Sequence, residues 1–506
     1  MNSIWYALLW KESREQRWKL VTLLVATCLF LPIPWLHDAQ GRWAEVIVAP
    51  LINVVAPLLL LAVPLVGMFL GAGIAASEQS QRTIGFLQSL PTSTRRIAVI
   101  KLFTAIATVL TPCTVAIGVA YVWMWAGVLP NEAASNPHTL ELAVLSYGLA
   151  VVSLLIWMAA AGVNRNDEVQ AGAIGLLVIL TCWAALGLFV EWPGINPSIS
   201  RICYAAAPAG AVTIFQGLSN GPVLLAPGAE NPSRWPLIVT ALVTHGALIA
   251  WYVQRFGRVV PGRRQAVDTL PRMSEVAWLG PPRVRPWTAI LWKQTRETMP
   301  LAALGAAAIL CVSISIASVV YRHSGEFGAD FAFAAGMTWM VAGFLVSVVA
   351  GIGLLMDDLR PGLHGFWRSR PINPDQWFVI KFTVSLLTTV LTLALPTIII
   401  FGGVVAANGG DASLDGYINI NLIWLLPILG LLAQVGAFSI AAAAMAFTRQ
   451  PVTAAIVAIL TAIGAIAFSE AYATSAVRLA TFIAVAIATA TLAAWLAVRN
   501  NWGWGR

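Results

Sequence analysis

Charge is scarce in this sequence. Only 10% of the 506 residues are Asp, Glu, Lys or Arg, whereas 59% are hydrophobic, and the mean hydropathy is +0.79. Soluble globular proteins carry about 25% charged residues. The scarcity of charge therefore excludes an ordinary soluble domain and indicates a chain that lies mostly within a membrane.

Groups that do chemistry are scarce as well. The few cysteines are scattered along the chain, so no disulfide framework is expected: Cys28, Cys113, Cys182, Cys203 and Cys311. The histidines show no H-x-x-x-H spacing, and no Ser/His/Asp arrangement is legible. No G-x-x-x-x-G-K-[ST] loop that would cradle nucleotide phosphates occurs anywhere. We therefore expect no enzyme, no metal and no cofactor bound by this chain.

What the sequence does contain is a series of long apolar runs. A membrane-spanning helix needs about 20 such residues, and the runs predict an all-α membrane protein with twelve transmembrane helices. They cover roughly 18–36, 44–76, 97–126, 140–163, 169–190, 235–254, 299–320, 331–356, 376–406, 418–446, 452–470 and 477–498.

Lys and Arg fall mostly on one side of these spans, the side that carries both termini. The opposite side holds a short set of them: Arg42, Arg201, Arg234, Arg322 and Arg478. Because positive charge resists translocation, both termini are predicted to be cytoplasmic. The excess of Lys and Arg thus indicates the orientation of the chain in the membrane and contact with anionic lipid headgroups. No nucleic-acid partner is expected.

The sequence repeats itself. "WYALLWKESRE", from Trp5 to Glu15, aligns with "WTAILWKQTRE", from Trp287 to Glu297. Each is predicted to form an interfacial helix, with these members: Trp5, Trp10, Lys11, Glu15, Trp287, Trp292, Lys293 and Glu297.

A second pair of segments also aligns, Glu78 to Lys101 with Asp358 to Lys381. Each pair holds the same place relative to the spans. The chain is therefore predicted to be two parallel six-helix repeats: a first half over 1–254, a cytoplasmic linker rich in Arg and Pro over 255–286, and a second half over 287–506.

The polar inserts that follow the second span of each half read as short amphipathic helices. Ile84, Leu87 and Leu90 share one helical face of the first insert. Pro91 and Pro371 end the two inserts, because proline cannot continue a helix. Two interpretations stay open at this point: a surface helix that anchors the loop, or a docking surface for a cytoplasmic partner.

The order of these elements resembles the ABC-2 family of ABC exporter permeases. The resemblance rests on the interfacial motif and on E-x-x-x-R-T-x-x-x-L-x-x-L-P-x-S-x-R-x-x-x-x-x-K, which runs here from Glu78 to Lys101. It implies that the inserts are coupling helices that contact ATPases. The implied coupling residues are Glu78, Arg82, Phe86 and Pro91 in the first half and Asp358, Arg360, Phe366 and Pro371 in the second.

The resemblance also implies partners and a location. Two cytoplasmic ABC ATPase subunits would bind the ATP and Mg²⁺, other exporter components are further candidate partners, and the chain would lie in the cytoplasmic (inner) membrane among lipid. Short re-entrant helices are expected in the external segment 191–234. The second half departs from the motif at Gly362 and Leu363, which puts identical docking at the two sites in doubt.

An ion-coupled secondary transporter of the major-facilitator type is the alternative, because that architecture also has two parallel six-helix halves. Its usual G-x-x-x-D-R-x-G-R-R loop is missing between the second and third spans. Asn53, His245 and Gln434 are the polar residues deep enough to line a pathway. A pathway so poor in charge favours an amphipathic or lipophilic cargo.

Overall fold

In the computed structural model, all regular secondary structure within the described part of the chain is helical. That part comprises residues 2–30, 64, 66–79, 92–125, 137–165, 168–190, 197–212, 235–258, 286–324, 329–356, 358–359, 373–407, 420–472 and 476–502. The helices are α1 (Asn2–Phe30), α6 (Thr94–Trp125), α8 (Pro137–Gly162), α9 (Glu168–Val190), α10 (Pro197–Ala206), α12 (Trp235–Arg255), α14 (Pro286–Ser324), α15 (Ala329–Met356), α17 (Pro374–Ala407), α18 (Ile420–Thr448), α19 (Pro451–Tyr472) and α20 (Ala476–Arg499). Residues 66–79 are also helical.

Seven stretches within the described residues are long and apolar enough to cross a membrane. They are Thr94–Val115, Leu145–Gly162, Glu168–Leu186, Trp235–Arg255, Pro374–Pro396, Gly430–Thr448 and Thr481–Arg499. By length and composition the chain is thus a multi-pass α-helical membrane protein. The count of twelve spans stays a prediction.

The expected interfacial helices are not separate elements. In the first half α1 continues without a break through the polar motif and into the following apolar run. The reason is local, because no Gly or Pro lies between Lys11 and Phe30 to stop the helix. In the second half α14 likewise continues through Pro300.

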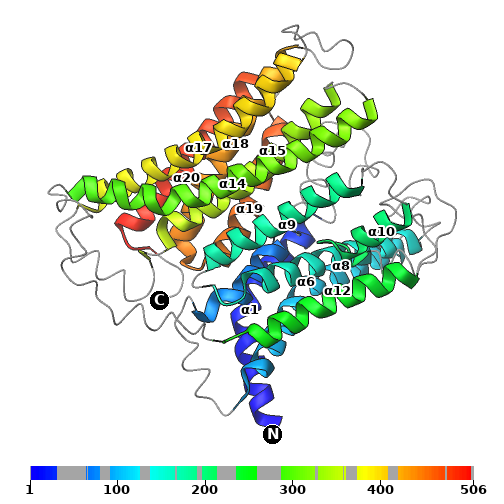
Figure 1. Cartoon of the computed structure of the whole chain (residues 1–506). Helices are drawn as coiled ribbons and strands as arrows, with labels where there is room; N and C mark the ends of the chain where they lie inside the picture. The colour runs from blue at the N-terminus through cyan, green and yellow to red at the C-terminus, as the bar shows by residue number, and fades with distance from the viewer. Residues whose placement is uncertain are drawn as a thin grey trace, which may run out of the picture.

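Helices from the first and second parts of the chain have matching neighbours. α1 packs against α6 as α14 packs against α17, and α8 packs against α9 and α12 as α18 packs against α19 and α20. Figure 1 shows the first set in blue to green and the second in green to red, lying side by side. The matching contacts agree with the duplicated sequence motifs.

Glycines allow two helices to approach closely at matching places. A Cβ on Gly71 would lie 2.5 Å from the carbonyl oxygen of Leu155 in α8, and a Cβ on Gly351 would lie 2.5 Å from that of Phe438 in α18. The offset that aligns Glu78 with Asp358 also aligns these glycines. Small residues permit such approaches between membrane helices, so the backbones in effect touch.

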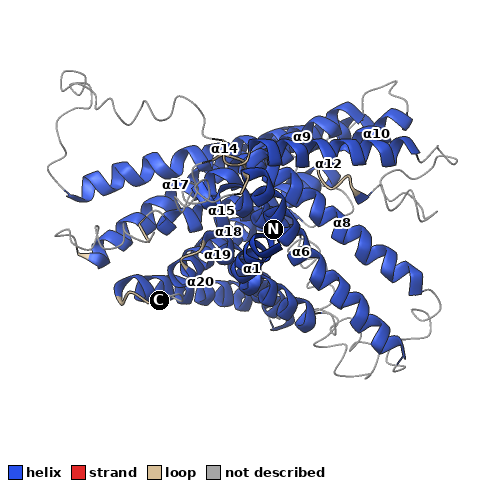
Figure 2. Cartoon of the chain, turned by 90° about the horizontal axis from the view of Figure 1, so that it is seen from below, coloured by secondary structure: helices blue, strands red, loops and turns tan. Residues whose placement is uncertain are grey.

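The two sets of helices meet through reciprocal contacts. α9 of the first set packs against α14 of the second, and α1 of the first packs against α19 of the second. Figure 2 shows α1 beside α19 near the middle of the molecule. Val452 and Ile456 of α19 belong to the same buried cluster as Leu70 and Ile74, so the core is continuous across the boundary.

The segment expected to form short re-entrant helices contains α10. It is ten residues long and packs against α9 and α12. The chain then turns over residues 207–212. α10 lies at the end of α9 that is remote from Glu168.

Candidate functional site

Lys101 is the centre of a buried charge cluster. Its Nζ atom lies 2.8 Å from Glu78 Oε1 and 3.1 Å from Glu12 Oε1. The three side chains are between 2% and 5% exposed. Because they come from α6, from the end of the 66–79 helix and from α1, ion pairs join three helices at one point.

Two further residues of α1 complete this first charge cluster. Lys11 Nζ lies 3.2 Å from Glu78 Oε1 and 3.3 Å from Glu15 Oε1. Lys11 is 38% exposed and Glu15 is 45% exposed, so the cluster extends from the buried centre to the surface. The first charge cluster therefore consists of Lys11, Glu12, Glu15, Glu78 and Lys101.

A second charge cluster occupies the matching place in the other half. Lys381 of α17 donates to Asp358, and Lys293 of α14 lies 3.7 Å from both Asp358 and Glu297. These four residues align with Lys101, Glu78, Lys11 and Glu15 in the sequence repeat. The residues that the two halves share are thus the ones that meet in space.

The clusters differ at one position, where the first half has Glu12 and the second has Gln294. Gln294 Nε2 donates to Ser385 Oγ at 2.6 Å and to Thr298 Oγ1 at 3.1 Å. In the first half, Ala105 aligns with Ser385, so the first half has no hydroxyl at this position. Lys381 also lies 5.0 Å from the centre of the Trp377 ring, an attraction that partly replaces the missing carboxylate.

Burial dominates the ionisation of Glu12. It raises the pKa of the Glu12 carboxyl above its ordinary value, and the attraction of Lys101 offsets this only in part. Burial alone would lower the pKa of Lys11, but the neighbouring carboxylates, Glu78 foremost, outweigh it and raise this pKa. Burial therefore disfavours the charged form of Glu12 more than its neighbours in the cluster stabilise it.

This difference gives a pH-dependent prediction for Glu12→Gln. Because the folded protein binds the Glu12 proton more tightly than the unfolded chain does, the stability from this group is complete below the ordinary carboxyl pKa of about 4.3. It is lost as the pH rises through the raised folded value. We expect the two unfolding temperatures to agree at low pH and that of Glu12→Gln to exceed wild type increasingly toward neutral pH.

Unfolding in mild detergent, followed by circular dichroism across this pH range, measures the effect. Glu15→Gln removes an exposed carboxylate of the same cluster and is the control, with little expected change. Adding Ala105→Ser to Glu12→Gln should increase the gain, since it supplies the hydroxyl that Gln294 uses in the other half. A constant difference between Glu12→Gln and wild type at every pH would contradict the prediction.

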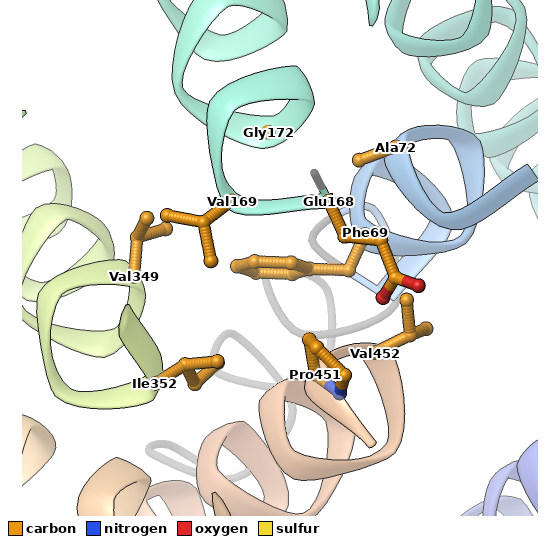
Figure 3. A pocket seen from close by; sticks show the side chains of 9 residues that line it. All are labelled: Phe69, Ala72, Glu168, Val169, Gly172, Val349, Ile352, Pro451 and Val452. Atoms are coloured by element: carbon orange, nitrogen blue, oxygen red, sulfur yellow. The ribbon is translucent and has the colours of Figure 1, made fainter. Parts of the chain in front are cut away.

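A pocket lies where the two sets of helices meet. Figure 3 shows the Phe69 ring extending across it, with Val349 and Ile352 of α15 on one side and Val452 of α19 on the other. Phe69 packs against three separate buried clusters, which include helices of both sets. We call this the central pocket; it is lined by Phe69, Ala72, Glu168, Val169, Gly172, Val349, Ile352, Pro451 and Val452.

Residues at matching places in α9 and α19 line the central pocket, and they differ at one position, where only the first set has a charged residue. Val169 follows the first residue of α9, and Val452 follows the first residue of α19. The first residues themselves are Glu168 and Pro451. Glu168 is 8% exposed, and its carboxylate is drawn beside Phe69 in Figure 3. A carboxylate thus enters the pocket from one half only.

The predicted coupling residues fall partly within the described part of the chain. Glu78 and Asp358 lie in the two charge clusters. The remaining coupling residues lie outside the described residues: Arg82, Phe86, Pro91, Arg360, Phe366 and Pro371. Both inserts begin within a few residues of a cluster.

The predicted tryptophans of the interfacial segments lie on the surface. Trp5, Trp10, Trp287 and Trp292 are each between 38% and 55% exposed. Exposed indoles at the end of a membrane bundle are typical of a membrane–water boundary. Arg14 lies 5.3 Å from the centre of the Trp10 ring, and Arg296 lies 5.2 Å from that of Trp292, so basic and aromatic side chains share the exposed side of these segments.

Two of the three predicted pathway residues, His245 and Gln434, sit between helices. His245 Nε2 of α12 lies 2.5 Å from Ser153 Oγ of α8, and its Nδ1 lies 2.7 Å from the Ala241 oxygen. Gln434 is fully buried, and its amide atoms have no hydrogen-bond partner in the described structure. Neither lines the central pocket. Asn53 lies outside the described residues.

Comparison with known proteins adds no family to this description. No protein-family model matches the chain, and a search of curated proteins finds no similar sequence. The repeated charge clusters and the central pocket are thus the features on which a function is argued.

Two residues of the site are missing from the sequence prediction. Glu12 was placed only on the polar side of the interfacial helix and not among the site residues, because the repeat does not share it. Glu168 follows a short polar turn after α8 and was not named. Both residues could have been found in the same way, because each is a carboxylate next to an apolar run. Ionised groups near membrane spans are costly, so those present tend to be functional.

Proposed function

We propose that this chain is the permease of an exporter, driven by ATP hydrolysis on separate cytoplasmic subunits, with an arrangement like that of the ABC-2 family. The observation that carries the proposal is the pair of charge clusters at matching places in two halves. Each ties the residue before a polar insert to two long helices. A partner that moves an insert would therefore move a whole half.

The mechanical argument follows from burial. Lys101 is held by two carboxylates that are out of reach of water, and breaking such contacts is costly. A displacement of the insert that follows Glu78 is therefore transmitted to α1 and α6 rather than absorbed locally. In the second half Asp358 stands in the same relation to α14 and α17.

We propose that the two halves move relative to each other at the contacts that join them. α1 and α9 of one half pack on α19 and α14 of the other. The central pocket is lined by Phe69 and Ala72 and by residues of α9, α15 and α19. We propose twelve spans in two parallel halves in the cytoplasmic membrane, both termini cytoplasmic. Tilting of one half against the other would open the central pocket to alternate sides. Its apolar lining supports an amphipathic or lipophilic cargo.

Co-purification tests the proposal. The tagged chain is isolated from its host in mild detergent, and its partners are identified by mass spectrometry. We expect an ATPase with a phosphate-binding loop to accompany wild type and to be lost from Phe86→Asp and Phe366→Asp. Isolation without any ATPase, together with transport that persists without ATP, would overturn the proposal.

One observation favours the alternative of an ion-coupled carrier. Glu168 is a buried carboxylate that lines the central pocket. Carriers use such groups to bind protons. Transport into vesicles that responds to a proton gradient, needs no ATP and is abolished by Glu168→Gln would support this function instead.

A further inference from the structure

Four helices carry the same pair of side chains, a tryptophan followed four residues later by an arginine. In each pair the guanidinium carbon lies over the indole ring, between 4.5 and 5.3 Å from its centre, within the range of a cation–π attraction. We call these the Trp–Arg pairs; they are Trp10–Arg14 in α1, Trp251–Arg255 in α12, Trp292–Arg296 in α14 and Trp495–Arg499 in α20. Each set of helices thus has one pair in its first helix and one in its last.

All four Trp–Arg pairs lie at the end of the bundle that carries the charge clusters. In α1 and α14 a lysine of a cluster directly follows the tryptophan. Beside the pair of α12, Tyr252 donates to the Ile74 carbonyl oxygen at 3.1 Å, one turn before Glu78. In α20, Trp495 Nε1 donates to Asp375 Oδ1 at 2.9 Å, in the first turn of α17. The candidate spans of α12 and α20 end at the arginines of their pairs, so the pairs lie where a membrane surface is expected.

The Trp–Arg pairs face the surroundings of the protein. The tryptophans of the pairs in α1, α12 and α14 are between 44% and 55% exposed, and the arginines of all four pairs are exposed. Within the described part of the chain, no ion pair joins Arg14, Arg255 or Arg296 to a carboxylate. Each of these three pairs therefore presents both a positive charge and an apolar ring to its surroundings.

An arginine that stacks on an indole still has donors for an anion. The ring covers one face of the planar guanidinium, whereas the N–H groups lie in its plane and point outward. They match two oxygens of a phosphate group. The exposed indole is favoured where polar headgroups meet apolar chains. A soluble anion would satisfy only the arginine, but a phospholipid satisfies both members of the pair.

We infer that the Trp–Arg pairs bind anionic phospholipid, with the phosphate on the guanidinium and the acyl chains beside the indole. A headgroup with a net negative charge is favoured over a zwitterionic one, because the arginines attract a charged lipid surface. Four defined positions thus hold anionic lipid, two in each set of helices. These sites stand independently of the proposed exporter function.

The pairs of α1 and α14 give the sharper test. An arginine in the last turn of a helix also stabilises the helix dipole, and this alone would account for Arg255 and Arg499. Arg14 and Arg296 lie well before the ends of their helices, where the dipole gives no such benefit. A role for these two arginines therefore has to come from a partner outside the helix.

Native mass spectrometry of the full chain in dodecyl maltoside measures the lipid that it retains. Phosphatidylglycerol is added in one arm and phosphatidylcholine in the other. We expect wild type to retain phosphatidylglycerol in preference. Arg14→Gln and Arg296→Gln should each lower the apparent affinity for phosphatidylglycerol about five-fold, with little change for phosphatidylcholine. Trp10→Leu combined with Trp292→Leu keeps both charges and should also weaken the retention of phosphatidylglycerol.

Arg95→Gln is the control for charge alone, since it removes an exposed arginine of α6 and should keep the preference of wild type. Equal retention of the two lipids by wild type would overturn the inference. So would a loss in Arg95→Gln as large as that in Arg14→Gln, because the attraction would then belong to the basic surface as a whole. Loss of a co-purifying protein from Arg14→Gln, with lipid retention unchanged, would assign the pairs to a protein partner and overturn it as well.

Discussion

Lys101→Met is expected to destabilise this protein more than any other single change to a charge cluster. The substitution keeps the length of the side chain but leaves the buried Glu12 and Glu78 with the partly exposed Lys11, 3.7 and 3.2 Å away, in place of a buried cation. Removing one partner of a buried ion pair costs about 3–5 kcal/mol. Total stabilities are only about 5–15 kcal/mol, so we expect a large fall in the unfolding temperature in detergent.

The two halves provide matched controls. Lys293→Met removes a lysine whose side chain is 52% exposed, and exposed pairs contribute at most about 1 kcal/mol. Lys381→Met leaves a single carboxylate, Asp358, and should fall between the two. Lys101→Met combined with Glu12→Gln and Glu78→Gln should regain most of the loss. A stability of Lys101→Met close to that of wild type would show that the cluster is not buried as described.

Substitution of the close-contact glycines should have the next largest effect. Gly71→Ala and Gly351→Ala each place a methyl group 2.5 Å from a backbone carbonyl oxygen of the neighbouring helix. That oxygen cannot rotate away, so the two helices must separate. Overpacking of this kind costs about 1–3 kcal/mol. Ala72 and Ile352, the residues next to the two glycines, both line the central pocket, so the double substitution should depart from the sum of the single costs.

Gly246→Ala is the control for helix propensity. Its added methyl group would meet nothing within 4 Å, so the substitution should be neutral or stabilise the protein by up to about 1 kcal/mol. Unfolding temperatures in one detergent compare the three variants. Equal behaviour of Gly71→Ala and Gly246→Ala would contradict the close approach of residues 66–79 to α8.

The sequence predicts the helical, membrane-embedded character of the chain, because apolar runs are a strong signal. It also identifies Lys11, Glu78 and Lys101 through the repeat, although not their contacts with one another. Contacts between residues far apart in the chain depend on how the helices pack, and a single sequence does not contain that information. Glu12 was placed on the polar side of the interfacial helix but not among the site residues, because a comparison of repeats discards the positions at which they differ.

The boundaries of the first helices were predicted less well. The change from polar to apolar composition near residue 18 predicts the end of one helix and the start of another. Composition reports the environment of a helix rather than its ends, which are set by residues that stop the hydrogen-bond ladder. Neither Lys19 nor Leu20 stops the hydrogen-bond ladder, and α1 continues through both.

The contacts between the halves have the geometry of a symmetric dimer, because α1 packs on α19 and α9 packs on α14. In a dimer of identical chains every substitution appears twice, once on each side of the axis. A single chain that contains both halves is free of this restriction. It can have Glu168 at the central pocket where the matching residue of the other half is Pro451. It can likewise have Glu12 in one charge cluster and Gln294 at the matching position of the other. The two sets of helices in this chain thus differ in the charges that they bury.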